Sequence, residues 1–204
     1  MAAVLRTPIP RARILSIDVS AAAAIEGVAA VMTAADIPGQ QKWGHLKRDW
    51  PAMIGEGEET RYIGDALAIV AARTKKIAQE AVRSIRLEYE ELSPLLSPQE
   101  SLADTAPKLH PDGNVLSRVA FARGDANQAI ETAAHVVTRS YHTPFTEHAF
   151  LEPESALAVP GSDGKLTVYV GSQSVFDDHH GIAAILGLPG EQVRVIGAFL
   201  EDTP

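Results

Sequence analysis

A glutamine at a predicted strand end is the residue whose setting most clearly indicates chemistry. Gln173 follows Gly171 and Ser172, directly after an alternating apolar stretch. A side-chain amide there can either satisfy a nearby loop or donate a hydrogen bond to a bound group. The run of residues 141–173 also contains an acid in an apolar setting and a strand pair. This combination is typical of one wall of a cofactor site.

The acid in that run is Glu152, which lies between Leu151 and Pro153. The proline restricts the backbone before it, and the apolar neighbours indicate partial burial. A buried carboxylate needs an arginine or a backbone donor as its partner. We therefore expect Glu152 to have a structural role and not a catalytic one.

Three histidines raise the alternative of a divalent-metal hydrolase. His148 stands four residues before Glu152, and His179 and His180 follow later. Pro144 and Pro153 bracket the first pair, which disfavours a regular ligand-bearing helix, and no His-Glu-x-x-His pattern occurs. We expect His179 and His180 to be solvated helix residues, and we assign no metal ligand. The sequence also has no glycine-rich phosphate loop, nucleophile elbow or Ser-His-Asp set.

The composition is that of an ordinary globular protein. The 204 residues are 46% hydrophobic and 22% charged, with a formal net charge of -8. The acidic balance argues against a nucleic-acid or anionic-membrane partner, and no apolar run approaches the roughly 20 residues of a membrane span. No export signal is visible at the start, so we expect a cytoplasmic protein.

The chain contains no cysteine. This excludes a disulfide framework, a thiolate nucleophile, a zinc-thiolate site and an iron–sulfur cluster within these residues. Any electron transfer through iron–sulfur centres would need other polypeptides or domains.

The first half alternates strand and helix patterns. The clearest helix begins after Thr74, because its apolar residues fall on one stripe: Ile77, Ala78, Ala81, Val82 and Ile85. Ser20 is expected to cap an alanine-rich helix that ends at Gly27, and Gly64 to need an unusual backbone angle in a turn. Residues 40–59 have no sustained period and are expected to form a loop. Strands are expected at residues 14–19, 28–32, 66–71 and 85–89.

The second half follows a linker at residues 101–114, which is the best domain boundary. A helix is expected over residues 126–134, with Ile130 and Ala133 facing inward. A second helix is expected over residues 175–186 and a hairpin turn at residues 161–164. Strands are expected at residues 135–141, 155–159, 166–170 and 193–196. The pattern predicts an α+β or mixed α/β fold in two units divided near residue 105.

Several segments, taken in order, resemble the large subunit of molybdenum hydroxylases, the xanthine dehydrogenase and aldehyde oxidase family. Those at residues 8–14, 27–39, 61–71 and 87–92 resemble its a/b hammerhead domain, and those at 113–115, 124–125 and 141–173 resemble the start of its molybdopterin-binding region. The insert with Trp43 and Trp50 resembles bacterial xanthine dehydrogenase-like members, which include a selenium-dependent group.

The resemblance implies a hammerhead domain over residues 1–104, a linker over 105–116, and the N-terminal part of a molybdopterin-binding domain over 117–204. It implies that Gln173 lies beside the molybdenum and donates a hydrogen bond to an oxygen there without adding charge. The whole enzyme would oxidise a purine, an aldehyde or an N-heterocycle with oxygen from water. Iron–sulfur clusters and FAD would lie on partner subunits or domains. No catalytic residue is assigned, because the family's base lies beyond this chain.

In the family, the strand that matches residues 193–199 continues into a glycine-rich loop near the molybdopterin. Here Leu200 is followed by Glu201 and Asp202, so we expect that the loop is skipped or that the chain is truncated. A chain of this extent would neither hold molybdopterin tightly nor turn over substrate, and it would expose apolar surface that favours homo-oligomers. The alternative is a non-catalytic scaffold or interaction module that retains the fold.

Overall fold

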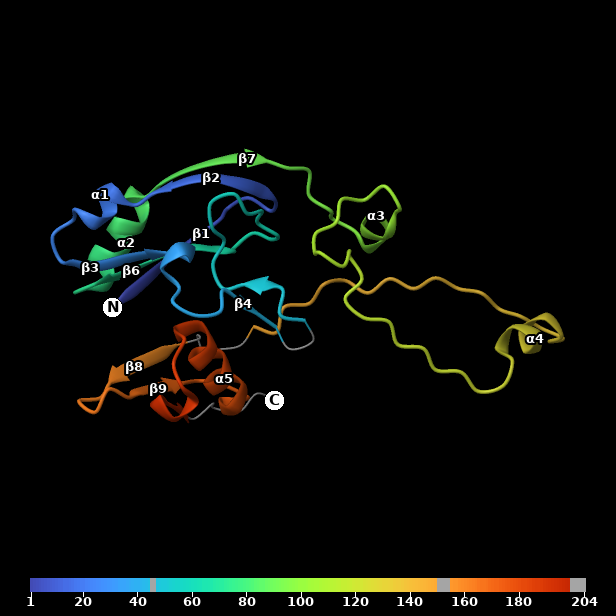
Figure 1. Ribbon diagram of the computed structural model, residues 1–204. Coiled ribbons are helices and arrows are strands. Elements are labelled where there is room, and N and C mark those ends of the chain that lie inside the picture. The colour runs from blue at the N-terminus through green and yellow to red at the C-terminus, as the bar shows by residue number, and fades with distance from the viewer. Residues whose placement is uncertain (45–46, 150–154, 199–204) are drawn as a thin grey trace.

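A computed structural model describes residues 1–44, 47–149 and 155–198 (Figure 1). Helices and strands are mixed, and the strands form two three-stranded sheets and two two-stranded sheets within this part of the chain. The strands of the first half are β1 (Ala2–Arg6), β2 (Ala12–Asp18), β3 (Val28–Thr33), β4 (Lys42–Trp43), β5 (Trp50–Pro51), β6 (Ala66–Ala72) and β7 (Arg86–Glu91). The predicted α+β class is confirmed.

Strand β6 is the centre of the first half, which we call the β6 unit (β1 to β7). It pairs antiparallel with β1 on one edge and with β3 on the other. Helix α2 (Lys75–Ser84) packs across β6, β1 and β3. Leu67 and Val70 of β6 are fully buried, and Ala78 and Ala81 of α2 are too. The small alanine side chains let the helix approach the sheet closely.

Helix α2 begins where the sequence predicts. The Thr74 hydroxyl accepts a hydrogen bond from the Ile77 N–H at 3.2 Å, which satisfies one of the free donors at the helix start. Strands β2 and β7 form an antiparallel ribbon in which Ile14 and Ile17 are buried. The register shifts between Ile14 and Ser16, so a bulge brings these two isoleucines to the same face.

A buried aspartate fixes the turn before β6. Asp65 is only 3% exposed, and its Oδ2 accepts hydrogen bonds from the N–H groups of Arg61 and Tyr62 at 2.6 and 3.3 Å. Gly64 has a φ of +109°, as the sequence predicts, because a side chain there would strain the backbone. The turn is therefore structural.

The prediction for Ser20 is wrong. Helix α1 (Ser20–Ala23) is a single turn that ends well before Gly27, and Val19 occupies the N-cap position. The Asp18 carboxylate accepts hydrogen bonds from both the N–H and the hydroxyl of Ser20, at 3.0 and 2.6 Å. Asp18 therefore satisfies the helix start in place of Ser20, and the pKa of Asp18 is lowered by these hydrogen bonds.

The excursion, residues 40–59, is irregular as predicted apart from the two-residue ladder of β4 and β5. Its contacts reach the linker after helix α3 (Pro98–Leu102). Lys47 Nζ lies 3.0 Å from Asp112 Oδ2, and His110 Nδ1 lies 2.7 Å from Asp49 Oδ2. Two side-chain pairs thus hold the linker against the excursion.

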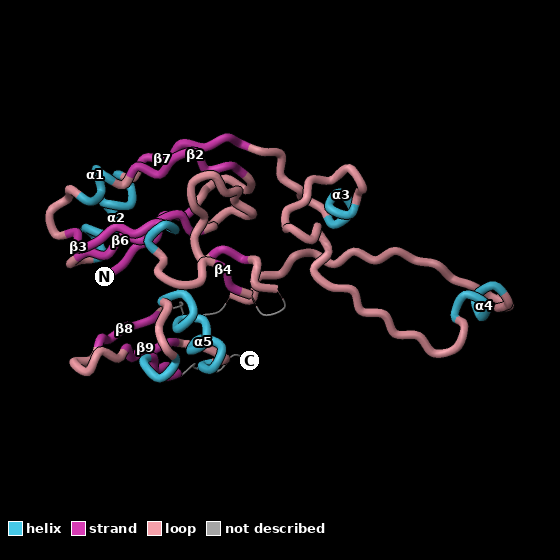
Figure 2. Tube along the Cα trace, in the orientation of Figure 1, coloured by secondary structure: helices cyan, strands magenta, loops and turns pink. Residues whose placement is uncertain are grey.

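Residues 115–149 form an arm that projects from the rest of the molecule and carries helix α4 (Ala126–Glu131) at its tip (Figures 1 and 2). Every described side chain of the arm is exposed, including Phe121 at 92% and Tyr141 at 90%. The prediction of a strand at residues 135–141 is wrong, since a strand needs a neighbour to pair with. The inward orientation predicted for Ile130 is also wrong, because its side chain is 57% exposed; Ala133 is exposed as well.

The second half ends in the β9 unit, which contains β8 (Ala156–Pro160), β9 (Leu166–Val170), helix α5 (Val175–Leu186) and β10 (Val193–Gly197). The predicted hairpin joins β8 to β9, with Gly164 at a φ of +79°. Strand β10 lies parallel to β9 on its other edge. None of the helices in the part of the chain that the structure describes has the length and apolar character needed to cross a bilayer.

Replacing Leu67 with alanine should lower the free energy of unfolding of the chain by about 2–5 kcal/mol. Leu67 is 0% exposed at the centre of the β6 unit, so its loss leaves a cavity between sheet and helix. Leu15→Ala, at a side chain that is 54% exposed, is the matched control and should change it by less than about 0.5 kcal/mol. Equal effects of the two changes in urea titrations would contradict this packing.

Replacing Glu59 with glutamine should make the free energy of unfolding depend less steeply on pH in the acid range. Burial alone raises the pKa of the Glu59 carboxyl, but hydrogen bonds from Arg11 and Arg13, at 2.9 and 3.0 Å, outweigh it and lower the pKa below its ordinary value of 4.5. A lowered folded-state pKa adds stability above the unfolded pKa, and this stability is lost as pH falls through the folded value.

Unfolding titrations between about pH 5 and pH 3 should therefore show a smaller loss of unfolding free energy for Glu59→Gln than for the wild type. Glu88→Gln on the exposed face of β7 is the control, and it should keep the wild-type slope. The same slope for both variants would show that the two arginines do not influence this carboxyl.

Candidate functional site

The candidate site is the edge of the β9 unit at which two parallel strands end. Val170 of β9 is paired with Gly197 of β10, and the Ala198 N–H donates to the Val170 carbonyl at 2.8 Å. Helix α5 begins a few residues after β9 ends and returns the chain to β10. Ligands of α/β proteins bind at the carboxyl ends of parallel strands, where the loops leave the sheet.

Gln173 lies at this edge, in the loop between β9 and α5. Its side chain is exposed, and within residues 1–44, 47–149 and 155–198 no hydrogen bond to its amide is found. The loop itself is held, because the Ser174 N–H donates to Ser172 Oγ at 3.0 Å. The amide is therefore presented outward from a fixed backbone and does not satisfy the nearby described loop.

The start of α5 carries polar groups that the sequence did not single out. The Ser174 hydroxyl donates to Asp177 Oδ2 at 2.6 Å, so it does not cap the helix. Asp178 Oδ2 is buried and has no hydrogen-bond partner among the described residues. A serine with two aspartates three and four residues after it is common at the start of a helix. The sequence pattern therefore carries no functional signal of its own.

The donor set of this edge fits the oxygen atoms of a cofactor but not a phosphate. A neutral amide can donate to an oxygen without adding charge. The carboxylates of Asp177 and Asp178 lie in the first turn of α5 and would repel a phosphate placed at that helix end. The exposed amide of Gln173 is the neutral donor at this edge that is free of a described partner.

The expectation that both His179 and His180 are solvated is half wrong. His180 is exposed, but His179 is partly buried, and its Nε2 lies 2.9 Å from the Gly190 carbonyl oxygen. This contact ties the middle of α5 to the turn that leads into β10. His179 therefore has a structural partner in the β9 unit.

The other residues considered from the sequence do not meet at the edge. Glu152 lies outside the described residues, and His148 is exposed on the arm. Among the residues that are described, no three His, Cys, Asp or Glu side chains are grouped as metal ligands. The concave region of about 390 Å³ between Arg61 and His110 is remote from Gln173 in sequence and lies beside the linker.

Comparison with known families decides the identity of the fold. The family model of the aldehyde oxidase and xanthine dehydrogenase a/b hammerhead domain matches residues 1–93, and that of the molybdopterin cofactor-binding domain matches residues 109–200. The chain belongs to the xanthine dehydrogenase and aldehyde oxidase family. The β6 unit lies in the hammerhead match, and the β9 unit with Gln173 lies in the cofactor-binding match.

Curated relatives match nearly the whole length of this chain. A probable xanthine dehydrogenase subunit of Bacillus subtilis is 37% identical over 195 residues, which is 96% of this chain and 26% of the relative. The nicotinate dehydrogenase large molybdopterin subunit of Eubacterium barkeri is 36% identical over 197 residues, which is 97% of this chain and 46% of the relative. The chain thus spans between about a quarter and a half of the length of these curated relatives.

Solved structures of the family agree in fold. Quinoline 2-oxidoreductase from Pseudomonas putida 86 matches 95% of this chain with a TM-score of 0.82 and 28% identity. Aldehyde oxidoreductase from Desulfovibrio gigas matches 96% with a TM-score of 0.79 and 26% identity. The match covers 26% and 23% of those two proteins, respectively.

Proposed function

We propose that this chain is part of a molybdenum-cofactor-dependent hydroxylase that oxidises a purine such as xanthine, an aldehyde or an N-heterocycle with oxygen from water. The observation that carries the proposal is Gln173, an exposed amide fixed at the edge where β9 and β10 end. The names of the relatives include xanthine, nicotinate, aldehyde and quinoline substrates, which supports this range.

In this proposal the chain binds and orients, and it does not carry the catalytic base. When bound, the molybdenum cofactor supplies the centre that takes electrons from the substrate. Gln173 Nε2 would donate a hydrogen bond to an oxygen of that cofactor, and the hydrogen bond between the Ser174 N–H and Ser172 Oγ would keep the loop backbone in place. The loop backbone lies between a strand and a helix and is held by that contact, so only the Gln173 side chain would have to be ordered on binding.

The proposal also assigns the boundaries and partners. Residues 1–104 would form the hammerhead domain, 105–116 the linker, and 117–204 part of the cofactor-binding domain. Because the chain has no cysteine, iron–sulfur clusters would lie on partner subunits or domains. By resemblance to the family, FAD would lie there as well. Several relatives are named as subunits, which supports such partners. The remainder of the molybdenum subunit would complete the site, in a cytoplasmic enzyme.

A second candidate function is a non-catalytic scaffold or interaction module. The exposed arm favours it, because Val119, Phe121 and Phe145 project large apolar side chains into solvent, with exposures of 92% to 109%. Apolar side chains gathered on one surface mark a place of association. The two candidates differ in whether substitution of Gln173 has any functional effect.

Replacing Gln173 with alanine in the complete subunit should lower substrate turnover by about 10- to 100-fold, because an outer contact to the metal centre is lost. The measurements are turnover with a purine, an aldehyde and an N-heterocycle, and molybdenum per subunit by mass spectrometry. Gln128→Ala, on exposed α4, is the matched control. Wild-type turnover in both variants would refute the role of Gln173, whereas a complete wild-type subunit with neither turnover nor molybdenum would favour the scaffold.

The 204-residue chain alone should purify with far less than one molybdenum per chain, because one wall of a site neither excludes water nor fixes a metal. It should also self-associate through the arm, and Phe121→Ser with Phe145→Ser should shift light-scattering mass toward the monomer. Stoichiometric molybdenum would contradict the first expectation, and a monomeric wild-type chain would contradict the second.

A further inference from the structure

Helix α5 docks onto the β6 unit through its last turn. The Gly39 N–H donates to the Ile185 carbonyl at 2.9 Å, and the Gln40 N–H donates to the Ala184 carbonyl at 2.8 Å. Carbonyls at the end of a helix have no partner within the helix. The backbone of the first half of the chain therefore satisfies the end of a helix from the second half.

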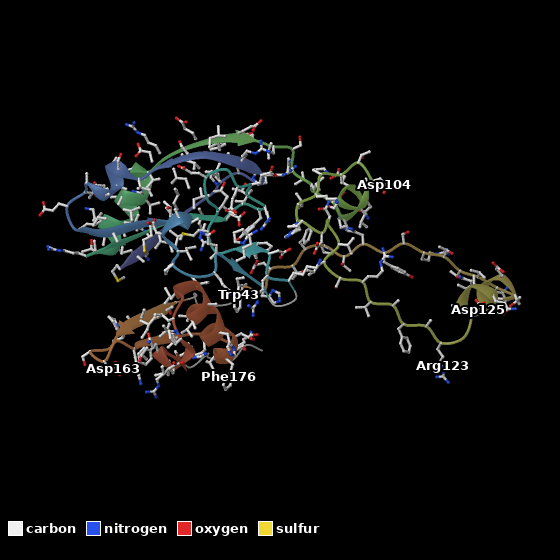
Figure 3. The ribbon with its side chains drawn as sticks, in the orientation of Figure 1. Trp43, Asp104, Arg123, Asp125, Asp163 and Phe176 are labelled. Carbon is white, nitrogen blue, oxygen red and sulfur yellow. The ribbon has the colours of Figure 1, made fainter. Side chains whose placement is uncertain are left out.

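Two glycines make this docking close. A Cβ atom on Gly39 would overlap the Ala184 carbonyl oxygen and would lie 2.5 Å from the Gly187 nitrogen. A Cβ atom on Gly181, in the middle of α5, would lie 2.7 Å from Cζ3 of Trp43. Figure 3 shows Trp43 on the side of the excursion that faces the β9 unit. The helix is thus touched at two points along its axis, and each contact tolerates only glycine.

Trp43 is also fixed within the excursion itself, on the side away from α5. Trp43 pairs with Trp50 in the β4–β5 ladder, and the Trp50 ring lies 5.5 Å from the Tyr62 ring and 6.5 Å from the His110 ring. Trp43 is therefore anchored to a segment that contacts both the turn before β6 and the linker. These contacts of Trp50 help to hold the strand pair that carries the backbone of Trp43.

Two fixed points on a rigid helix determine where its far end lies. With a rise of about 1.5 Å per residue, Gly181 lies roughly 6 Å from Ile185 and roughly 9 Å from Val175. If Ile185 is held, a shift of about 1 Å at Gly181 moves Val175 by roughly 2.5 Å. Gln173 lies just before that helix start, so its loop moves with it. Misplacement of about 1 Å is enough to reduce catalysis strongly.

We propose that Gly39, Trp43 and Gly181 form a positioning contact through which the β6 unit sets the place of the Gln173 loop. The consequence for the cofactor rests on the proposed function, but the placement of the loop does not. None of the three residues belongs to the buried core of the β6 unit. Their substitution should therefore move α5 without unfolding that core.

The test uses the 204-residue chain and amide hydrogen exchange measured by NMR. Gly39→Ala and Gly181→Ala should each speed exchange of the amides of residues 39 and 40, and of the hydrogen-bonded Ser174 and Asp178 amides within residues 171–178, by about tenfold or more. Amides of β6 should keep their wild-type rates. Alanine in a helix is intrinsically more favourable than glycine, so faster exchange in Gly181→Ala has the opposite sign to the effect of helix propensity.

Two matched variants serve as controls. Gly55→Ala adds the same methyl group where the nearest atom would be an ordinary 3.4 Å away, and His180→Ala changes an exposed neighbour of Gly181. Both should keep wild-type exchange at residues 39–40 and 171–178. In a Trp50→Phe background, Trp43 is the sole tryptophan, so Gly181→Ala should also shift its fluorescence maximum to longer wavelength.

Unchanged exchange at residues 171–178, with faster exchange at residues 39–40, would overturn the proposal, because the contact would then open without moving the loop. Unchanged exchange at both segments in Gly181→Ala would overturn it as well. A complete wild-type subunit without molybdenum would instead refute the proposed function, and the exchange results would still decide the positioning contact.

Discussion

The structure of the first half depends on the burial of β6 between two antiparallel neighbours and beneath α2. Leu67 and Val70 can be fully buried only because β1 and β3 provide hydrogen-bond partners for the backbone N–H and C=O groups on both edges of β6. Ala78 and Ala81 bring the helix close enough to exclude water from the same face. The turn at Asp65, the ribbon of β2 and β7, and the excursion are all attached to this arrangement.

The sequence predicts those elements whose pattern is set by local burial. Helix α2 has a complete apolar stripe and a threonine cap, and β6 has a continuous apolar run, so both are found at nearly the expected residues. Strand β1 is not predicted from the sequence, because Ala2–Arg6 is short and forms a strand only by pairing with β6, which lies far along the chain. Helix α3 was missed for the related reason that five residues carry too little periodicity.

The largest error, the strand expected at residues 135–141, has a physical cause. Alternation of apolar and polar side chains shows that a segment suits a sheet, but it does not supply the sheet. On the arm no described strand lies beside this segment, so its backbone remains extended and its side chains exposed. The same reasoning explains α4, whose capping Asp125 starts the helix although no surface covers Ile130.

Gln173 could be singled out from its neighbours, whereas the contact that positions its helix could not. Gly39, Trp43 and Gly181 are too far apart in the chain for any local pattern to connect them, and a glycine required by a close approach is indistinguishable in sequence from one required by a turn. Likewise, the buried Oδ2 of Asp178 and the contact of His179 with the Gly190 carbonyl are set by the tertiary packing of α5. Long-range packing, not local propensity, decides these features.

The distance in sequence between Gly39 and Gly181 has a consequence during synthesis. The β6 unit can close once residue 91 has left the ribosome, while Gly181 emerges on the order of ten seconds later at usual rates of translation. During that interval Trp43 and the Gly39 and Gln40 amides face solvent or a chaperone. The arrival of α5 then covers them, so this contact is one of the last long-range contacts to form during synthesis.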